Sequence, residues 1–343
     1  MSASEGGQPQ LGMDGGRAAR LCAELASGQS IAGGRYAVRS KRLVDFRNKP
    51  GQYLSLVLGD RSGEIQARAW DDAEALAARF EAGDVVAVTG RVETYQDRVQ
   101  LIITDLVKCP LEQVRREDFL PKSERDPDEM LTELVAACKS VRDPGLRKLL
   151  AAFFADPDFV AQFKTCPGAK GIHHAYIGGL IEHTLNVVKI CDNACDIYPQ
   201  LDRDLLVAGA LLHDVGKVRE YSYDTSIEVT HEGGLIGHVV VGYQMVAAQA
   251  EKTPELTSEE RLRIGHLMLA HHGEHQFGAP KLPMTAEACA LHYGENLDAQ
   301  VNGFLTAIAA DRGQGKGWTE YIRRLERSLF LGGAEVAAPA DDE

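Results

Sequence analysis

The chain contains no run of about 18 uncharged apolar residues, which is the length that a membrane-spanning helix requires. Residues 1–16 are rich in Gly, Ser and Gln and do not place a basic segment before an apolar one, as a secretory signal would. The seven cysteines are odd in number and show no regular Cys-x-x-Cys spacing, which indicates reduced thiols. We therefore expect a cytoplasmic protein with no membrane partner.

Positive charge is scarce, since 37 Lys and Arg residues face 50 Asp and Glu residues and leave a formal net charge of −13. This balance argues against a general nucleic-acid coat protein but allows a local basic groove. Residues 31–50 could supply one, because they carry six Lys or Arg residues and a single Asp. A solvated basic strand explains the charge of this segment equally well.

Histidine is missing from the first 172 residues, and all 11 histidines lie between His173 and His292. A length of 343 residues exceeds what one hydrophobic core usually organises and predicts two domains. Catalytic chemistry that uses imidazole is therefore expected in the second half alone. We divide the chain into an N-terminal tail (1–30), a first domain (31–110), a helical connector (111–160), a second domain (161–331) and an acidic C-terminal tail (332–343), with both tails expected to be mobile.

The first domain shows the alternation of short β-strands, expected at 36–38, 53–58, 65–70, 85–88 and 99–103. A helical stretch from Asp72 to Phe80 separates the third strand from the fourth, which is the layout of a small barrel. This order, with the segments Leu58-Gly59-Asp60-Arg61-Ser62-Gly63 and Gly83 to Val92, resembles the oligonucleotide/oligosaccharide-binding (OB) fold of the anticodon-binding type.

Barrels of this type bind single strands by stacking bases on aromatic side chains above a basic groove. The resemblance therefore implies a set of substrate-binding residues on the barrel surface. The candidates are the aromatic residues Tyr53, Trp70, Tyr95 and Phe46 and the basic residues Arg42, Arg68, Arg91 and Arg98. The competing interpretation is that each aromatic residue belongs to the barrel core.

The second domain is predicted to be all helical from its apolar periodicity. Helices are expected at 180–190, 205–214, 235–250, 261–271, 286–293 and 301–310, preceded by amphipathic stretches at 130–139 and 146–154. Nearly every one of these later helices carries a histidine or an aspartate in or beside its apolar pattern. These residues are His183, His213, Asp214, His238, His271, His272 and Asp298. A lone histidine on an apolar face is usually a hydrogen-bonded core residue, but repetition over successive helices indicates a metal site.

Neutral imidazole and carboxylate are suitable ligands for Mn, Fe, Co, Ni or Zn, and one aspartate can bridge two ions. Two bridged ions lower the pKa of a shared water and direct it at phosphorus. Lys217 follows Asp214 by three residues, so both side chains come up on nearly the same helix face. Lys217 could neutralise charge that develops on phosphate oxygens, or it could simply satisfy a helix C-terminus.

A histidine followed by the His213-Asp214 doublet, further histidines and a late aspartate resembles the HD superfamily of metal-dependent phosphohydrolases. The resemblance implies that His183, His213, Asp214 and Asp298 are core ligands. It places His238 and one or both of His271 and His272 at a second metal position. Relatives that cleave cyclic dinucleotides can hold a third metal through a glutamate one turn before the first histidine. Gly179 occupies that position here, so two metals are expected.

A closer likeness extends from Tyr36 to Phe330. It is carried by the barrel and by the segments 173–184, 269–274, 277–283, 297–299 and 317–321. In this arrangement the chain resembles the YhaM-type 3′-5′ exoribonucleases. The resemblance implies release of 5′-mononucleotides from the 3′ end of single-stranded RNA, with single-stranded DNA as a second substrate.

The same likeness implies activation by two divalent ions, for which Mn²⁺ is the expected metal and Co²⁺, Fe²⁺, Ni²⁺ and Mg²⁺ are alternatives. Homo-oligomers are compatible with it. Asp214, Lys217 and His174 are the expected catalytic residues, with His174 either at the scissile phosphate or behind a metal ligand.

Three other functions stay open from the sequence. The chain could be an HD phosphohydrolase that acts on a nucleotide or cyclic nucleotide and carries a regulatory barrel. It could be a nucleic-acid-binding regulator whose HD site is idle. A di-iron oxygenase is the least attractive, because nothing in the sequence selects redox-competent iron.

Overall fold

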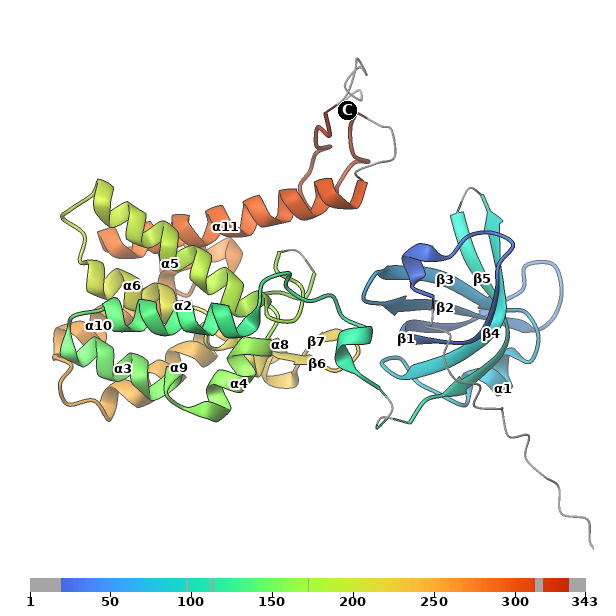
Figure 1. Cartoon of the computed structure of the whole chain (residues 1–343), viewed down its shortest axis with the longest axis horizontal. Helices are drawn as coiled ribbons and strands as arrows, with labels where there is room; N and C mark the ends of the chain where they lie inside the picture. The colour runs from blue at the N-terminus through green and yellow to red at the C-terminus, as the bar shows by residue number, and fades with distance from the viewer. Residues whose placement is uncertain are drawn as a thin grey trace, which may run out of the picture. The chain divides into compact units, whose positions relative to one another are not determined.

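The computed structural model describes residues 20–96, 98–110, 112, 114–171, 173–311 and 317–332. The chain divides into two compact units between Val114 and Arg115. The first unit is a β-barrel and the second is helical (Figure 1), which confirms the predicted all-β domain followed by an all-α domain. Most of the two expected tails, residues 1–19 and 333–343, lies outside the described residues.

The barrel contains all five predicted strands. Four are longer than predicted, and the third begins two residues earlier and ends one residue earlier than predicted. The strands are β1 (Ser30–Asp45), β2 (Gln52–Asp60), β3 (Gly63–Ala69), β4 (Val85–Tyr95) and β5 (Arg98–Lys108). The sheet closes in the order β1-β2-β3-β5-β4, with β3 and β5 parallel and the other pairs antiparallel. The expected helix between the third and fourth strands is the short α1 (Ala73–Ala77).

Alternation along β2 separates the barrel core from its surface. Leu54, Leu56 and Leu58 have no exposed surface, because every second side chain of a strand points into the barrel. Tyr53 and Ser55 point the other way and are half-buried. This register sends the polar and aromatic positions of β2 to the outer face.

The second unit consists of ten α-helices and a small hairpin within the described residues. The helices are α2 (Pro127–Ser140), α3 (Pro144–Phe154), α4 (Pro157–Thr165), α5 (Gly179–Ile197), α6 (Arg203–Leu212), α7 (Lys217–Glu220), α8 (His231–Leu235), α9 (His238–Glu251), α10 (Ser258–Ala270) and α11 (Ala286–Asp311). The hairpin pairs β6 (Tyr221–Tyr223) with β7 (Ile227–Val229). Short 3₁₀ turns occur in this unit at Arg116–Asp118 and His275–Phe277, and one occurs in the first unit at Cys22–Glu24.

Three helices of the second unit begin with the same Asp-Pro pair. Asp126, Asp143 and Asp156 each accept a hydrogen bond from a backbone N–H of the first turn. The following proline occupies the first helical position, where its missing N–H costs nothing and its fixed φ suits the helix. The segment 111–160, expected as a connector, thus holds α2, α3 and the start of α4, and their buried residues share one hydrophobic core with α5 and α6.

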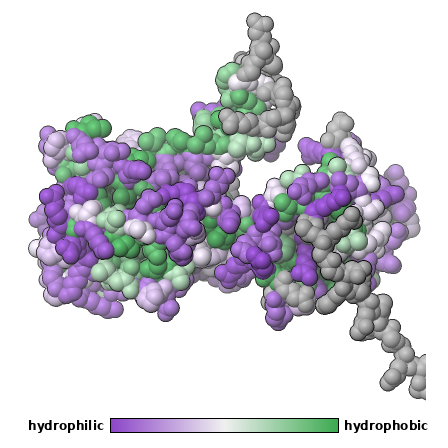
Figure 2. Space-filling view, in the orientation of Figure 1, coloured by the Kyte–Doolittle hydropathy of each residue, from purple (hydrophilic) through white to green (hydrophobic). Residues whose placement is uncertain are grey.

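Three expectations about the helices are wrong. The helix predicted at 205–214 ends at Leu212, and the predicted helices 286–293 and 301–310 are one continuous helix, α11. The helix predicted at 235–250 runs across the break between α8 and α9. The short helices α4, α7 and α8 and the β6–β7 hairpin were not anticipated. None of the helices among the described residues combines the length and hydropathy of a membrane span. Figure 2 shows that hydrophilic residues dominate the visible face of each unit, with smaller hydrophobic areas between them.

Candidate metal centre and nucleic-acid interface

The turn after α6 carries the His-Asp doublet. His213 is the C-cap of α6 and Asp214 follows it in the turn, so both lie just past the helix instead of inside it. Gly216 makes this turn possible, because a Cβ there would lie 2.1 Å from the carbonyl oxygen of His238. The first residue of α9 therefore packs directly against the turn, and this contact brings His238 to Asp214.

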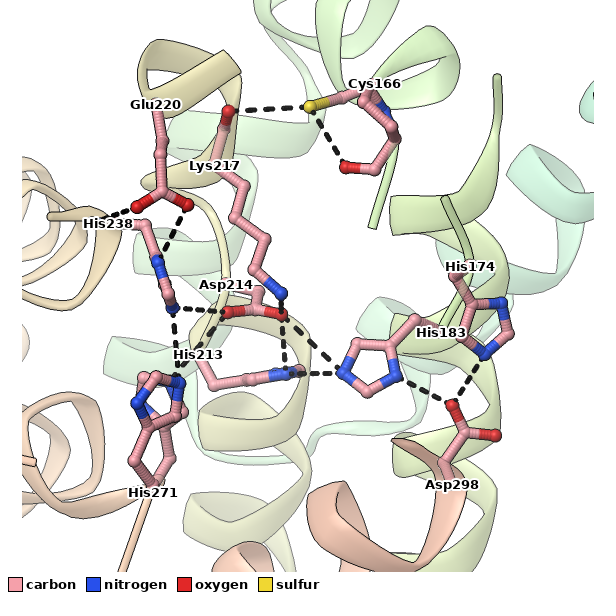
Figure 3. Close-up of polar contacts among 12 residues, drawn as sticks. Cys166, His174, His183, His213, Asp214, Lys217, Glu220, His238, His271 and Asp298 are labelled. Atoms are coloured by element: carbon pink, nitrogen blue, oxygen red, sulfur yellow. Dashed lines mark hydrogen bonds and ion pairs between the residues drawn. The ribbon is translucent and has the colours of Figure 1, made fainter. Parts of the chain in front are cut away.

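Imidazole nitrogens surround the two carboxylate oxygens of Asp214 (Figure 3). Asp214 Oδ2 lies 3.3 Å from His213 Nε2 and 3.5 Å from His183 Nε2. Asp214 Oδ1 lies 3.4 Å from His238 Nε2 and 3.7 Å from His271 Nε2. Each oxygen thus faces its own pair of histidines, which is the arrangement that a bridging carboxylate would have.

Hydrogen bonds on the far side of the rings fix the tautomers of several histidines. The Nδ1 atoms of three histidines lie 2.7–2.8 Å from backbone carbonyl oxygens: His213 to Ala210, His271 to Met268 and His272 to Phe277. A carbonyl only accepts, so each Nδ1 carries the proton and each Nε2 presents its lone pair. His238 Nδ1 lies 2.9 Å from Glu220 Oε2, which orients that ring in the same way.

The centre has polar atoms without partners. Among the described residues Asp214 Oδ1 and His271 Nε2 have no hydrogen-bond partner although both are buried, whereas Asp214 Oδ2 pairs with the ammonium group of Lys217. Burial lowers the pKa of His271 well below its usual value and lowers the pKa of His272 to about 4, so both rings are neutral at pH 7. Unpartnered lone pairs on neutral imidazoles beside a carboxylate fit a divalent cation of the Mn-to-Zn series.

Lys217 lies at the same carboxylate. Its Nζ is 2.6 Å from Asp214 Oδ2, and its side chain is almost fully buried. Burial disfavours the charged form of both side chains. Their mutual attraction outweighs burial, so the pKa of Asp214 lies well below its usual value and the pKa of Lys217 is raised. Lys217 belongs to the four-residue helix α7, and its ammonium group is directed to Asp214. Its role at the phosphate stays a prediction.

Asp298 binds the opposite nitrogen of His183. Its Oδ2 lies 2.6 Å from His183 Nδ1 and 2.8 Å from His174 Nε2, while Oδ1 accepts a hydrogen bond from Asn186. Burial would raise the pKa of this carboxyl group, but its contacts with His174 and His183 lower it. Asp298 on α11 therefore also orients the His183 ring toward Asp214, in addition to its expected role as a ligand.

His174 lies behind Asp298. Its Nδ1 is 2.8 Å from the hydroxyl of Tyr176, which donates in turn to Glu182, so the ring belongs to a chain of hydrogen bonds that ends on Asp298. Gly179 packs against the backbone here, since a Cβ would lie 2.0 Å from the His174 carbonyl oxygen. The place where relatives carry a third-metal glutamate therefore has no room for any side chain.

All seven expected ligands fall into three groups that could each hold an ion, and two of these groups share His183. These are His238 with His271 and His272, His183 with His213 and Asp214, and His174 with His183 and Asp298, and within each group the ligand atoms lie within 4.8 Å of one another. Both His271 and His272 thus face the centre. Their assignment as ligands stays a prediction.

On the barrel, three aromatic rings gather on the outer face. The ring centroids of Tyr53 and Trp70 are 4.9 Å apart, and Phe46 stacks on Trp70 at 6.2 Å. Trp70 is 37% exposed and Tyr95 is 52% exposed, so the alternative of a purely core role is wrong for these two residues. Trp70 and Tyr95 thus present aromatic surface to solvent.

Basic side chains flank the aromatic rings. The guanidinium of Arg68 lies 5.7 Å from the ring centroids of both Trp70 and Tyr95. Arg42 pairs with Ser55 in the β1–β2 register, and Ser55 pairs with Arg68 in the β2–β3 register, so one row of the outer face carries both arginines. Guanidinium groups beside exposed aromatic rings suit a single-stranded polyanion.

Sequence comparison assigns both units to known families. Residues 37–108 match the family described as OB-fold nucleic acid binding domain, and residues 180–300 match the HD domain. The protein named 3′-5′ exoribonuclease YhaM of Bacillus subtilis strain 168 is 34% identical over 292 residues, which cover 85% of this chain and 91% of that protein. The chain belongs to the YhaM family.

A second protein named 3′-5′ exoribonuclease YhaM, from Shouchella clausii, is 32% identical over 304 residues. These residues cover 88% of this chain and 93% of that protein. Among solved structures, the second OB-fold domain of replication protein A from Methanococcus maripaludis is 20% identical to this chain. The alignment covers 26% of this chain and 92% of that domain, with a TM-score of 0.22. Membership of the YhaM family confirms the resemblance, the OB-fold and HD assignment and a metal-dependent HD domain.

Two acidic residues of this YhaM-family chain were missed in the sequence. Glu220 orients His238, and it lies one turn after Lys217 on the same short helix. Glu295 lies one turn before Asp298 on α11, and burial followed by the charge of Asp214 raises its pKa to about 7. Helical spacing from an expected ligand was the signal that could have found both residues.

Proposed function

We propose that the chain is a metal-dependent 3′-5′ exoribonuclease that releases 5′-mononucleotides from single-stranded RNA. One observation carries the proposal: the buried Asp214 presents each of its oxygens to a different pair of histidines, in a chain that aligns along most of its length with proteins named 3′-5′ exoribonuclease YhaM. Single-stranded DNA is proposed as a second substrate and the cytoplasm as the place of action, which suits seven free cysteines.

We propose two divalent ions, with Mn²⁺ as the metal. His183, His213 and Asp214 would hold the first ion, and Asp214 would share the second with His238, His271 and His272. Asp298, the expected fourth ligand of the first ion, lies at the opposite nitrogen of His183 and would hold that ring in place. When bound, the ions would supply Lewis-acid activation of the phosphodiester and of the attacking water. The unpartnered Asp214 Oδ1 and His271 Nε2 support this donor set.

The chain's own residues prepare this centre. Lys217 keeps Asp214 ionised at a buried position, and its ammonium group is the cation that would counter charge on the phosphate oxygens. His174 acts through Asp298, since its Nε2 holds the carboxylate that orients His183. His174 is therefore a positioning residue in this proposal.

The barrel would hold the strand. Tyr53 and Trp70 offer ring faces for stacked bases, and Tyr95 lies beside them against Arg68. Arg42 and Arg68 share one row of the outer face and would contact phosphates. These contacts do not read the sequence of the bases, which suits a processing nuclease.

The test uses a 5′-labelled single-stranded RNA with Mn²⁺ and the full chain. We expect a ladder that shortens from the 3′ end, no turnover by Asp214→Ala, and strand binding by that variant close to wild type. Asp196→Ala, which removes an exposed carboxylate of α5, is the matched control and should stay active. Retained metal-dependent turnover by Asp214→Ala would sink the mechanism.

The alternatives give other results in the same assay. Turnover of free nucleotides or cyclic nucleotides without a ladder would identify a phosphohydrolase with a regulatory barrel. Strand binding with no turnover of any substrate would identify a nucleic-acid-binding regulator. A second, independent measurement of mass in solution would show whether the chain forms homo-oligomers.

A further inference from the structure

A pocket of about 230 Å³ opens beside the histidine cluster. His173 and His272 form one side of it, and α11 forms another through Glu295 and Asn296. The ring centroid of His173 lies 5.8 Å from that of His183, and His272 Nε2 lies 3.3 Å from His238 Nε2. The pocket is therefore adjacent to the place where the scissile phosphate would lie.

The size of the pocket limits what it can take. Sites for whole drug-sized ligands usually span about 300–1,000 Å³, so a pocket of about 230 Å³ suits one nucleoside and not a dinucleotide. Phe277, which is 57% exposed, lines it and offers a ring face for a base. The lining thus combines an aromatic surface with polar side chains, as a nucleoside requires.

Glu295 supplies the most specific group in the lining. It is half-buried on α11, and among the described residues its carboxyl group makes no hydrogen bond and no ion pair within the chain. A half-buried carboxyl group that lines a pocket and has no partner within the chain can accept a hydrogen bond from a ligand. Acidic side chains bind ribose hydroxyls in dinucleotide-binding folds for the same reason.

Arg324 closes the pocket from the C-terminal segment. One of its nitrogens donates to the carbonyl oxygen of Gly171 at 2.9 Å, which fixes the guanidinium group at the pocket. Its remaining N–H groups carry positive charge and can donate hydrogen bonds to a hydroxyl or a phosphate oxygen. Asn296 adds an amide, which can both donate and accept.

We propose that this pocket holds the nucleoside at the 3′ end of the RNA and that Glu295 hydrogen-bonds its terminal ribose hydroxyls. The proposal rests on the exoribonuclease function proposed above. In that reaction the nucleoside that leaves is joined to the scissile phosphorus through its own 5′ oxygen. Its sugar is therefore joined to the phosphorus at the metal centre through C5′ and O5′. Its 2′-hydroxyl is present on every ribonucleotide, but its free 3′-hydroxyl exists only at a strand end.

The experiment compares two 5′-labelled RNA strands of one sequence, of which one ends in a normal ribonucleotide and the other in a 2′-deoxynucleotide. The rate of the first cleavage is measured in single turnover with Mn²⁺. We expect wild type to cleave the ribose end about tenfold faster, because a 2′-hydroxyl donates to Glu295 and a hydrogen does not. Glu295→Leu should cleave the ribose end more slowly, and the ratio of the two rates should fall to about one.

Two further variants separate binding of the sugar from general damage. Phe277→Ala should slow both strands equally and keep the ratio, since it removes the stacking surface alone. Glu251→Leu, which replaces an exposed carboxylate on α9 outside the pocket, should keep both the rate and the ratio of wild type.

The outcomes distinguish this proposal from the function on which it rests. A wild type that shortens RNA but cleaves both ends at one rate overturns the pocket assignment only. A Glu295→Leu variant that keeps the wild-type ratio overturns it as well. A wild type that shortens neither strand overturns the exoribonuclease, and the pocket assignment falls with it.

Discussion

Lys217 Nζ lies 2.6 Å from Asp214 Oδ2, and both side chains are almost fully buried. A buried ion pair is costly to form, and breaking it by removing one partner costs more, because the other charge stays behind without compensation. The pair therefore keeps Asp214 ionised and in place whether or not a metal ion is bound.

Replacing this lysine should affect the metal-free protein most. Lys217→Met removes the ammonium group but keeps most of the side-chain volume, so Asp214 loses its partner. We expect the free energy of unfolding in EDTA to fall by about 3–5 kcal/mol. With saturating Mn²⁺ the loss should be clearly smaller, because the ion compensates the carboxylate. Urea unfolding in both conditions measures this, and equal losses would show that Asp214 is not at the metal site.

Glu220 should matter for metal affinity although it lies outside the expected ligand set. Its carboxylate contacts His238 Nδ1 at 2.9 Å and orients Nε2 toward Asp214. Glu220→Gln should weaken Mn²⁺ binding about 10–100-fold, which is typical when the group that orients a histidine ligand is removed. Titration calorimetry measures it. Glu232→Gln, which removes a partner of Arg219, is the control and should bind Mn²⁺ as wild type does.

The buried histidines should make the metal-free protein acid-sensitive. Burial, followed by the charge of His238, lowers the pKa of His272 to about 4, against about 6.5 in an unfolded chain. Below about pH 6.5 His272 becomes protonated in the unfolded chain but stays neutral in the folded chain. The free energy of unfolding therefore falls as pH drops from about 6.5 to about 4. His272→Gln should reduce this slope by up to about 1.4 kcal/mol per pH unit in EDTA. An unchanged slope in urea titrations at successive pH values would contradict the assignment.

The exposed rings of the barrel should contribute to strand affinity without affecting the metal centre. Trp70→Ala in the Asp214→Ala background should weaken single-stranded RNA binding by about 1–3 kcal/mol, the usual cost of losing one base stack. Fluorescence anisotropy at fixed salt measures this. Tyr198→Ala, which removes a ring that is 60% exposed in the helical unit, should leave the affinity unchanged. Wild-type affinity of the Trp70→Ala variant would show that the strand binds to another surface.

The sequence was sufficient for the parts of the fold that depend on local pattern. Alternation along 53–58 predicts which side chains of β2 face the core, and the three leucines at 54, 56 and 58 are indeed without exposure. The His213-Asp214 doublet likewise follows from residues that are adjacent in the chain. Both features need no knowledge of how distant segments pack.

Features that depend on tertiary packing could not be predicted. Asp298 reaches His183 across 115 residues, and only the packing of α11 on α5 shows which ring nitrogen it contacts. The polar residues Glu295 and Asp298 interrupt the apolar pattern of α11, so the sequence suggested two helices where there is one. Their burial overrides the pattern because they face the site and not solvent.

The continuity of α11 links the proposed sugar pocket to the metal centre. Glu295 and Asp298 are three residues apart on this unbroken helix, so about 4.5 Å along the axis separates their backbone positions. A regular helix keeps this rise fixed, so any shift of α11 would displace the carboxyl group that lines the pocket together with the carboxylate that orients His183. The pocket and the metal centre would therefore move as one unit.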